Sequence, residues 1–169
     1  MAPKINKKIS KYNFTAYMNR SIDYIVIHWV GGASSAKNNA TYFYNGNRNA
    51  SAHYFVDANE IWQSVSDKNA AWAVGGGAYS QGSKGSKYGN KCKNANSISI
   101  ELCCIKKNGK LIVDPKAITK ARVLVKYLQA KYDIPDSHVI RHFDVTGKSC
   151  PGGYLTDKKW KALRKRLTD

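Results

Sequence analysis

With 169 residues and a hydrophobic fraction of 43%, the chain is long and apolar enough to form one folded domain, which excludes a disordered protein. No apolar run approaches the roughly 20 residues that a membrane-crossing helix needs, so no transmembrane segment is predicted. Lysine and arginine outnumber aspartate and glutamate by 28 to 11, and the net charge of +17 favours a polyanionic partner. Nucleic acid, an acidic membrane surface and the anionic polymers of a bacterial wall all qualify, and a role in solubility alone is the alternative.

The first 20 residues are basic and polar, without a clear period. Four side chains are expected to dock this segment on the rest of the chain: Tyr12, Phe14, Tyr17 and Met18. We therefore divide the chain into a packed basic N-terminal segment, residues 1–20, and a domain of residues 21–169. The N-terminus lacks the apolar core and cleavage site of a secretory signal, so synthesis in the cytoplasm is expected.

A β-branched and aromatic run from Tyr24 to Trp29 predicts a buried central strand, which Gly31 and Gly32 are expected to end. The spacing of residues 36–45 predicts a short helix, with Ser34 or Ser35 as its N-cap. Two strand-like runs, AHYFVD and EIWQSVS, follow as a hairpin with a two-residue turn. Residues 75–96 are rich in Gly, Ser, Lys and Asn and predict a long surface loop.

The strand pattern resumes from Ser97 to Cys104, with Glu101 on the face opposite the Ile and Leu side chains. A carboxylate in the middle of a strand is costly if buried without a partner, and such groups cluster at functional sites. Cys103 and Cys104 point to opposite faces and are expected to be small buried hydrophobes. Cys92 is either free or paired.

The strongest helix pattern runs from Pro115 to Tyr132, with an apolar stripe and an early proline. A basic C-terminal helix is predicted from Thr156 to Leu167, with three side chains directed inward: Trp160, Leu163 and Leu167. No linker, repeat or second domain is visible in the sequence.

The segment RHFDVTGKSCPG contains His142 and Cys150, and His28 lies at the end of the first predicted strand. Two His and one Cys are three ligands for a zinc ion that keeps its fourth position open to water. Each residue alone has an ordinary explanation, as a hydrogen-bonded core histidine or a structural cysteine. The combination indicates a zinc hydrolase.

A structural zinc site would need a fourth protein ligand, which His53 or Cys92 could provide. That arrangement would suit a basic nucleic-acid-binding protein. No predicted helix combines a basic face with groove-reading residues, so no nucleic-acid partner is expected.

The chain resembles the zinc-dependent N-acetylmuramoyl-L-alanine amidases of the amidase-2 type, a family that includes phage endolysins and shares its fold with animal peptidoglycan-recognition proteins. Residues 20–165 carry the matching segments in family order: YIVIHW, SAHYFVD, the AW pair at 71–72, NSISIELC and RHFDVTGKSCPG. With the order of strands and helices, the resemblance implies a single α/β domain with a mixed central sheet flanked by helices. Two departures are Ala52, where some members carry a tyrosine, and Ala73-Val74, where a histidine is common.

The resemblance implies that His28, His142 and Cys150 bind Zn²⁺, that Glu101 is the general base and that Lys148 is a basic catalytic residue. Three further residues are expected to contact the substrate: His53, Trp72 and Trp29.

The implied reaction is hydrolysis of the lactyl–L-Ala amide bond of peptidoglycan by a monomeric phage endolysin or bacterial autolysin. The enzyme would reach the wall after lysis or holin-type release, and anionic wall polymers would be partners. A non-catalytic peptidoglycan-binding receptor is the alternative, which the retained Cys150 and Glu101 disfavour.

Overall fold

The computed structural model describes residues 2–75 and 86–169. The strands are β1 (Asn6–Lys7), β2 (Phe14–Thr15), β3 (Tyr24–Ala33), β4 (Tyr54–Val56), β5 (Ile61–Gln63), β6 (Ala70–Ala71), β7 (Ser97–Lys107), β8 (Lys110–Val113) and β9 (Val139–Arg141). The helices are α1 (Ala36–Tyr44), α2 (Pro115–Tyr132), α3 (His142–Thr146) and α4 (Asp157–Thr168), with 3₁₀ turns η1 (Asn94–Asn96) and η2 (Asp136–His138). Within the described residues, no helix is both long and apolar enough to cross a membrane.

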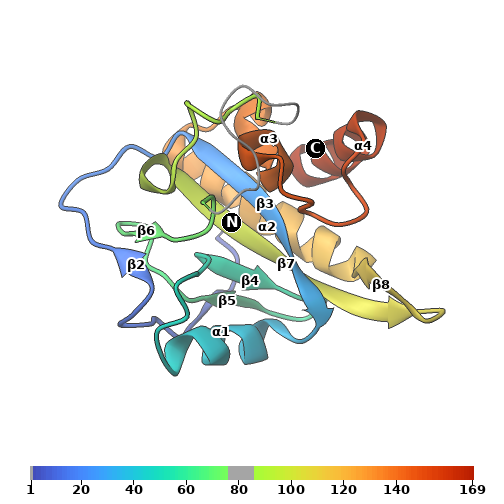
Figure 1. Ribbon diagram of the computed structural model, residues 1–169, viewed down its shortest axis with the longest axis horizontal. Helices are drawn as coiled ribbons and strands as arrows, with labels where there is room; N and C mark the ends of the chain where they lie inside the picture. Colours follow the sequence, from blue (N-terminus) through green and yellow to red (C-terminus); the bar gives the residue numbers. More distant parts are fainter. Residues whose placement is uncertain (1, 76–85) are drawn as a thin grey trace.

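A mixed sheet runs through the molecule in the order β1-β5-β4-β7-β3-β9, and β8 pairs with the far part of β7 (Figure 1). The strands β4, β7, β3 and β9 are parallel, whereas β5 is antiparallel to β4 and β8 is antiparallel to β7. A separate two-stranded sheet joins β2 to β6. The predicted α/β fold with a mixed central sheet is confirmed.

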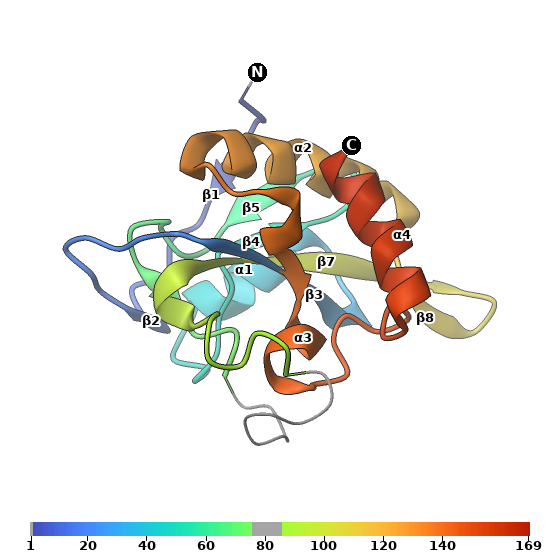
Figure 2. The same cartoon turned by 90° about the horizontal axis from the view of Figure 1, so that it is seen from above.

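Helices cover both faces of the sheet. Figure 2 shows α2 and α4 together on one side of it and α3 on the other. Ile25 and Ile27 of β3 belong to the core on the α2–α4 side, with Leu163 of α4. On the second face, α1 packs over Phe55 and Cys103. Because side chains alternate along a strand, His28 points to this second face.

The strand β3 continues through Gly31 and Gly32 to Ala33, so the prediction that these glycines end the strand is wrong. The pairing with β7 shifts its register between Trp29 and Ala33, and Gly31 has a φ of +72°. Glycine adopts this left-handed conformation without steric cost, so the residue marks a β-bulge inside the strand.

Several predicted elements are confirmed by local contacts. The helix α2 spans the predicted residues because the Asp114 side chain accepts the Lys116 N–H at 2.9 Å and Pro115 occupies the first turn. The hairpin β4–β5 turns where Asp57 accepts the N–H groups of Asn59 and Glu60, each at 2.8 Å. A turn at Asn108-Gly109 leads into β8, a strand that the sequence did not predict.

The N-terminal segment joins the domain through strand pairs, β1 with β5 and β2 with β6. Of the side chains expected to dock it, Met18 is fully exposed and Tyr12 and Tyr17 are also exposed, so that expectation is wrong for them. Asn13 is buried instead, and its Nδ2 donates to the Phe43 and Gly46 carbonyls at 3.2 and 2.8 Å.

The predicted loop over residues 75–96 is described only in part, since residues 76–85 lie outside the described residues. Its later part forms turns and η1, and brings Cys92 into an apolar cluster with Tyr24 and Val26. The four cysteines are free and buried, as expected for Cys103 and Cys104.

Candidate active site

The register of the sheet brings three of the predicted site residues together. In the parallel pairs, His28 of β3 lies opposite Glu101 of β7, and Ile27 lies opposite Arg141 of β9. His142 directly follows Arg141 as the first residue of α3. The rings of His28 and His142 therefore lie side by side, with centroids 4.7 Å apart.

Cys150 reaches the same place through a loop that is fixed to α3. The helix ends at Thr146, and Gly147, which caps it with a φ of +72°, turns the chain back. The Phe143 N–H then donates to the Cys150 carbonyl oxygen at 2.9 Å. These contacts leave the Cys150 Sγ atom 3.7 Å from His28 Nδ1.

The ligand atoms of His28, His142 and Cys150 lie within 4.8 Å of one another, and all three residues are buried. Tetrahedral zinc bonds place a sulfur and a nitrogen ligand about 3.5 Å apart, close to the 3.7 Å observed between Cys150 and His28. Within the described part of the chain, His28 Nε2 and both ring nitrogens of His142 have no hydrogen-bond partner. Buried polar atoms nearly always have one, so these residues fit a metal centre.

Burial holds both imidazoles neutral. It lowers the pKa of His28 well below its usual value, and His142 and Lys148 add to this effect. It also lowers the pKa of His142 to about 4 and raises the pKa of the Cys150 thiol to about 12. Since neutral imidazole is the form that binds metals, the two histidines are in the ligating form at neutral pH. Cys150 would release a proton on binding.

Glu101 faces the cluster from the neighbouring strand. Its Oε2 atom is buried and has no hydrogen-bond partner among the described residues. Burial raises the pKa of Glu101 to about 8, and the charge of Lys148 partly opposes this. Lys148 itself is exposed, yet its charge also lowers the pKa of both cluster histidines. Both predicted catalytic residues thus lie near the three predicted ligands.

His53 is placed differently from the other predicted site residues. It is 1% exposed, its Nδ1 accepts the Ser99 N–H at 3.1 Å, and its Nε2 contacts the Asn69 carbonyl at 3.0 Å. Because Nδ1 accepts, the ring proton is assigned to Nε2, which donates to Asn69. Both nitrogens are used inside the protein, and the substrate contact of His53 remains a prediction.

The two tryptophans that are expected to contact substrate each contact another segment of the chain. The Trp72 indole N–H donates to Thr15 Oγ1 of β2 at 2.9 Å. The Trp29 ring lies against Gly152, in the loop that carries Cys150. Their substrate contacts remain predictions.

The fourth ligand that a structural zinc site would need is not found among the described residues, where the candidate group consists of three. His53 is engaged elsewhere, and Cys92 lies in a separate apolar cluster with Val26. Three protein ligands are typical of a catalytic zinc site, and four are typical of a structural one.

Arg141 is a supporting residue that was not predicted. It is 3% exposed, and its Nε donates to Asp144 Oδ1 at 2.9 Å. Its Nη1 donates to the carbonyl oxygens of Tyr154 and Leu155 at 3.0 and 2.6 Å. The guanidinium thereby fixes the loop after Cys150 to the start of α3. The signal in the sequence is an arginine and an aspartate three residues apart around a predicted ligand.

The fold and the site together define an α/β domain with a candidate three-ligand metal centre beside a buried carboxylate. A family model described as N-acetylmuramoyl-L-alanine amidase (Amidase_2) matches residues 18–153. The chain therefore belongs to this family, which confirms the resemblance inferred from its motifs.

Known relatives agree with the assignment. A probable N-acetylmuramoyl-L-alanine amidase of Bacillus licheniformis is 28% identical over 166 residues, which cover 95% of this chain and 45% of that protein. The structure of PlyL has a TM-score of 0.78 at 28% identity, covering 99% of this chain and 98% of that one. A mutant endolysin from Bacillus subtilis has a TM-score of 0.76 at 26% identity, covering 99% and 100%. The chain spans about half the length of the curated relatives it matches.

Proposed function

We propose that the chain is a zinc-dependent N-acetylmuramoyl-L-alanine amidase, which hydrolyses the amide bond between the lactyl group of N-acetylmuramic acid and the L-alanine of the stem peptide in peptidoglycan. The observation that carries the proposal is a set of buried atoms without a hydrogen-bond partner among the described residues. They are His28 Nε2 and both ring nitrogens of His142, beside Cys150, and Glu101 Oε2. Membership of the amidase family supports the choice of substrate.

In this proposal His28, His142 and Cys150 hold Zn²⁺, which when bound polarises the scissile carbonyl and lowers the pKa of water. Glu101 accepts a proton from the attacking water and returns it to the leaving amine of L-alanine. A pKa near neutrality suits a group with both tasks, and burial raises the pKa of Glu101 to about 8.

Lys148 has a separate part in this mechanism. Its ammonium group stabilises the negative charge that develops on the carbonyl oxygen during attack. Removal of one such donor from an enzyme costs about 3 kcal/mol of transition-state stabilisation. The electrostatic effect of Lys148 on Glu101 and His142 supports its position near the reacting atoms.

We further propose that residues 21–169 are the catalytic domain, with residues 1–20 packed on it, and that it acts as a monomer on the bacterial wall. An endolysin among the similar structures supports a lytic role, with access to the wall after lysis or holin-type release. A bacterial autolysin is the other setting for the same activity. The net charge of +17 supports anionic wall polymers as additional partners.

The decisive experiment measures the products released from purified peptidoglycan. We expect new amino-terminal L-alanine without new reducing sugar ends, loss of this activity after chelation and its return with zinc. A receptor of the same fold would bind the wall and release no amino groups. That result with zinc-loaded protein would reject the proposal.

A further inference from the structure

The helices α2 and α4 concentrate positive charge on the side of the sheet away from the metal-ligand cluster. The helix α2 contains five basic residues and no acidic one, and α4 contains six basic residues and one acidic one. The two helices pack on the same side of the sheet, as Figure 2 shows. His28 points to the opposite face, where α3 lies.

Most of these cations have no acidic partner among the described residues. The ion pairs of the two helices join Lys131 to Asp67 and Lys165 to Asp169, and the Asp157 carboxylate of α4 is held by Arg141. Among the described residues, the Lys126 ammonium donates to the backbone oxygens of Thr168 and Asp169 at the end of α4. Apart from Lys126, eight cations of the two helices form no ion pair in the described part of the chain: Lys116, Lys120, Arg122, Lys158, Lys159, Lys161, Arg164 and Arg166.

The spacing of these cations destabilises the two helices by repulsion between like charges. Lys116 and Lys120 are four residues apart, as are Arg122 and Lys126. Like charges at this spacing face each other on a helix and destabilise it. A surface that serves solubility alone intersperses both signs. A polyanion lying across the two helices would relieve the repulsion.

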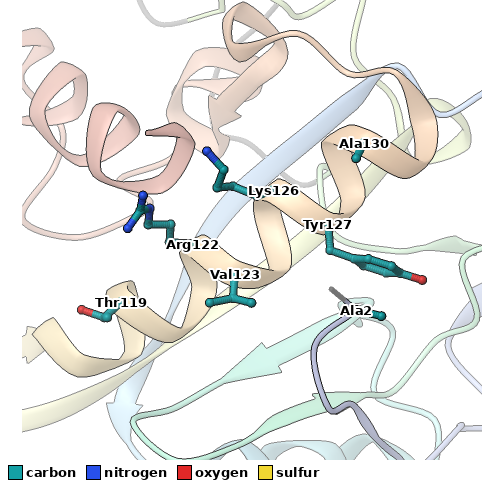
Figure 3. A pocket seen from close by; sticks show the side chains of 7 residues that line it. All are labelled: Ala2, Thr119, Arg122, Val123, Lys126, Tyr127 and Ala130. Atoms are coloured by element: carbon teal, nitrogen blue, oxygen red, sulfur yellow. The ribbon is translucent and has the colours of Figure 1, made fainter.

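The outer side of α2 is also hollowed. Val123 is 47% exposed and lines three neighbouring hollows of about 420, 290 and 360 Å³. Figure 3 shows the first of them, where Arg122 and Lys126 extend to the side of α2 that faces α4. Lys120 lines the other two hollows, and Glu60 is the acidic residue at the second. An apolar floor with cations at its rim suits a chain that alternates phosphates with short uncharged units.

We propose that the outer surface of α2 and α4, here called the helix face, binds a linear phosphate-bearing polymer of the bacterial wall. The proposal rests on the function proposed above, which brings the chain to the wall. It adds the place of binding. The polymer contacts α2 and α4 on one side of the sheet, and peptidoglycan contacts the side that carries the metal-ligand cluster. The protein can therefore stay bound to the wall while it hydrolyses peptidoglycan. Both helices are held in the core through their buried apolar sides, whereas a major-groove reader inserts a helix into the nucleic acid.

Two variants with equal net charge distinguish binding by the helix face from retention that depends only on the total charge of the protein. The helix-face variant carries Lys120→Gln, Arg122→Gln, Lys161→Gln and Arg166→Gln. The matched variant changes four exposed lysines elsewhere to Gln: Lys37, Lys68, Lys91 and Lys106. Each set lowers the net charge by four, so the two variants carry the same charge. Both are made in the full chain with Glu101→Gln, so that retention is measured without turnover and does not depend on the amidase proposal.

Retention is measured on purified walls before and after removal of their phosphate polymers with hydrofluoric acid. For the helix-face variant we expect a loss of wall affinity of about 10-fold or more at 150 mM salt and a shallower salt dependence, because fewer counterions are released. The matched variant should lose much less. Circular dichroism of both variants confirms that they are folded.

Three results would overturn the proposal. Equal losses in the two variants would mean that total charge, and no particular face, governs retention. Undiminished binding to the stripped walls would exclude a phosphate polymer as the occupant. A helix-face variant that keeps wall affinity but loses binding to duplex DNA would assign the face to nucleic acid.

Discussion

The indole ring of Trp29 lies so close to Gly152 that a Cβ atom at position 152 would stand 2.3 Å from the ring atoms Cζ2 and Cη2. Real Cβ atoms do not approach a ring this closely, so only glycine fits here. Gly152 follows Cys150 by two residues. The ring of β3 therefore supports the loop that brings the sulfur atom to the candidate metal centre.

We expect Gly152→Ala to displace this loop, because the tryptophan ring is packed and cannot yield freely. Overpacking of this kind costs about 1–3 kcal/mol. Thermal unfolding should show a lower midpoint, and zinc titration should show weaker binding. Gly32→Ala is the matched control, since a Cβ atom there would meet no described atom within 4 Å. A Gly152→Ala protein with unchanged unfolding and zinc affinity would contradict this account of the loop.

Cys150→Ser should abolish stable zinc binding, because it replaces the thiolate ligand while the two imidazoles remain. The measurement is zinc content by atomic emission after dialysis against a weak chelator. Cys103→Ala is the control, as Cys103 is buried beneath α1 and away from the cluster. Equal zinc content in the two proteins would show that Cys150 is not a ligand.

Glu101→Gln should keep its zinc and lose rate. The amide cannot accept a proton, and general acid–base catalysis contributes about 10²- to 10⁴-fold. The release of amino groups from purified wall should fall by this factor, in samples whose zinc content equals that of the wild type. A residual rate within a few-fold of the wild type would remove Glu101 from the role of general base.

Asp67 provides a test of stability against pH that is independent of the metal centre. Its carboxylate accepts hydrogen bonds from the Tyr54 and Tyr132 hydroxyls at 2.5 and 2.7 Å and from Lys131 Nζ at 3.0 Å. Burial alone would raise the pKa of Asp67, but these contacts hold it below the usual value. A depressed pKa in the folded state contributes stability above the unfolded-state pKa of about 3.9, and this contribution is lost as the pH falls through the folded pKa.

We therefore expect Asp67→Asn to be less stable than the wild type by about 1.5–3 kcal/mol at pH 7, and the difference to shrink below about pH 4. Thermal unfolding between pH 7 and pH 2 measures both effects. Tyr132→Phe removes one donor and keeps the charge, so it should produce a smaller change of the same kind. A difference that stays constant across this range would mean that the carboxylate charge has no part in the stability.

The elements that could be predicted from sequence are those with strong local determinants. The helix α2 has a capping aspartate, a proline in its first turn and a regular apolar stripe, so its bounds follow from neighbouring residues. The strands β1, β2 and β9 have two or three residues each and form only against distant partners. For the same reason the bulge at Gly31 looked like a strand end, because only the pairing with β7 distinguishes the two.

The sequence allowed the candidate ligands and the candidate base to be predicted, but not the residues that hold them in place. His28, His142, Cys150 and Glu101 stand out because imidazole, thiol and carboxylate groups at strand ends and mid-strand are unusual. The part played by Arg141 depends on the backbone carbonyl groups of Tyr154 and Leu155, whose positions no side-chain pattern reveals.

Two of the three candidate ligands depend on a short strand at the rim of the sheet. The strand β9 has three residues and, among the described strands, pairs with β3 alone; it leads directly into His142 and the loop of Cys150. Fraying of this rim would detach both donors at once and leave His28 alone on its strand. Metal content should therefore report whether this edge is intact.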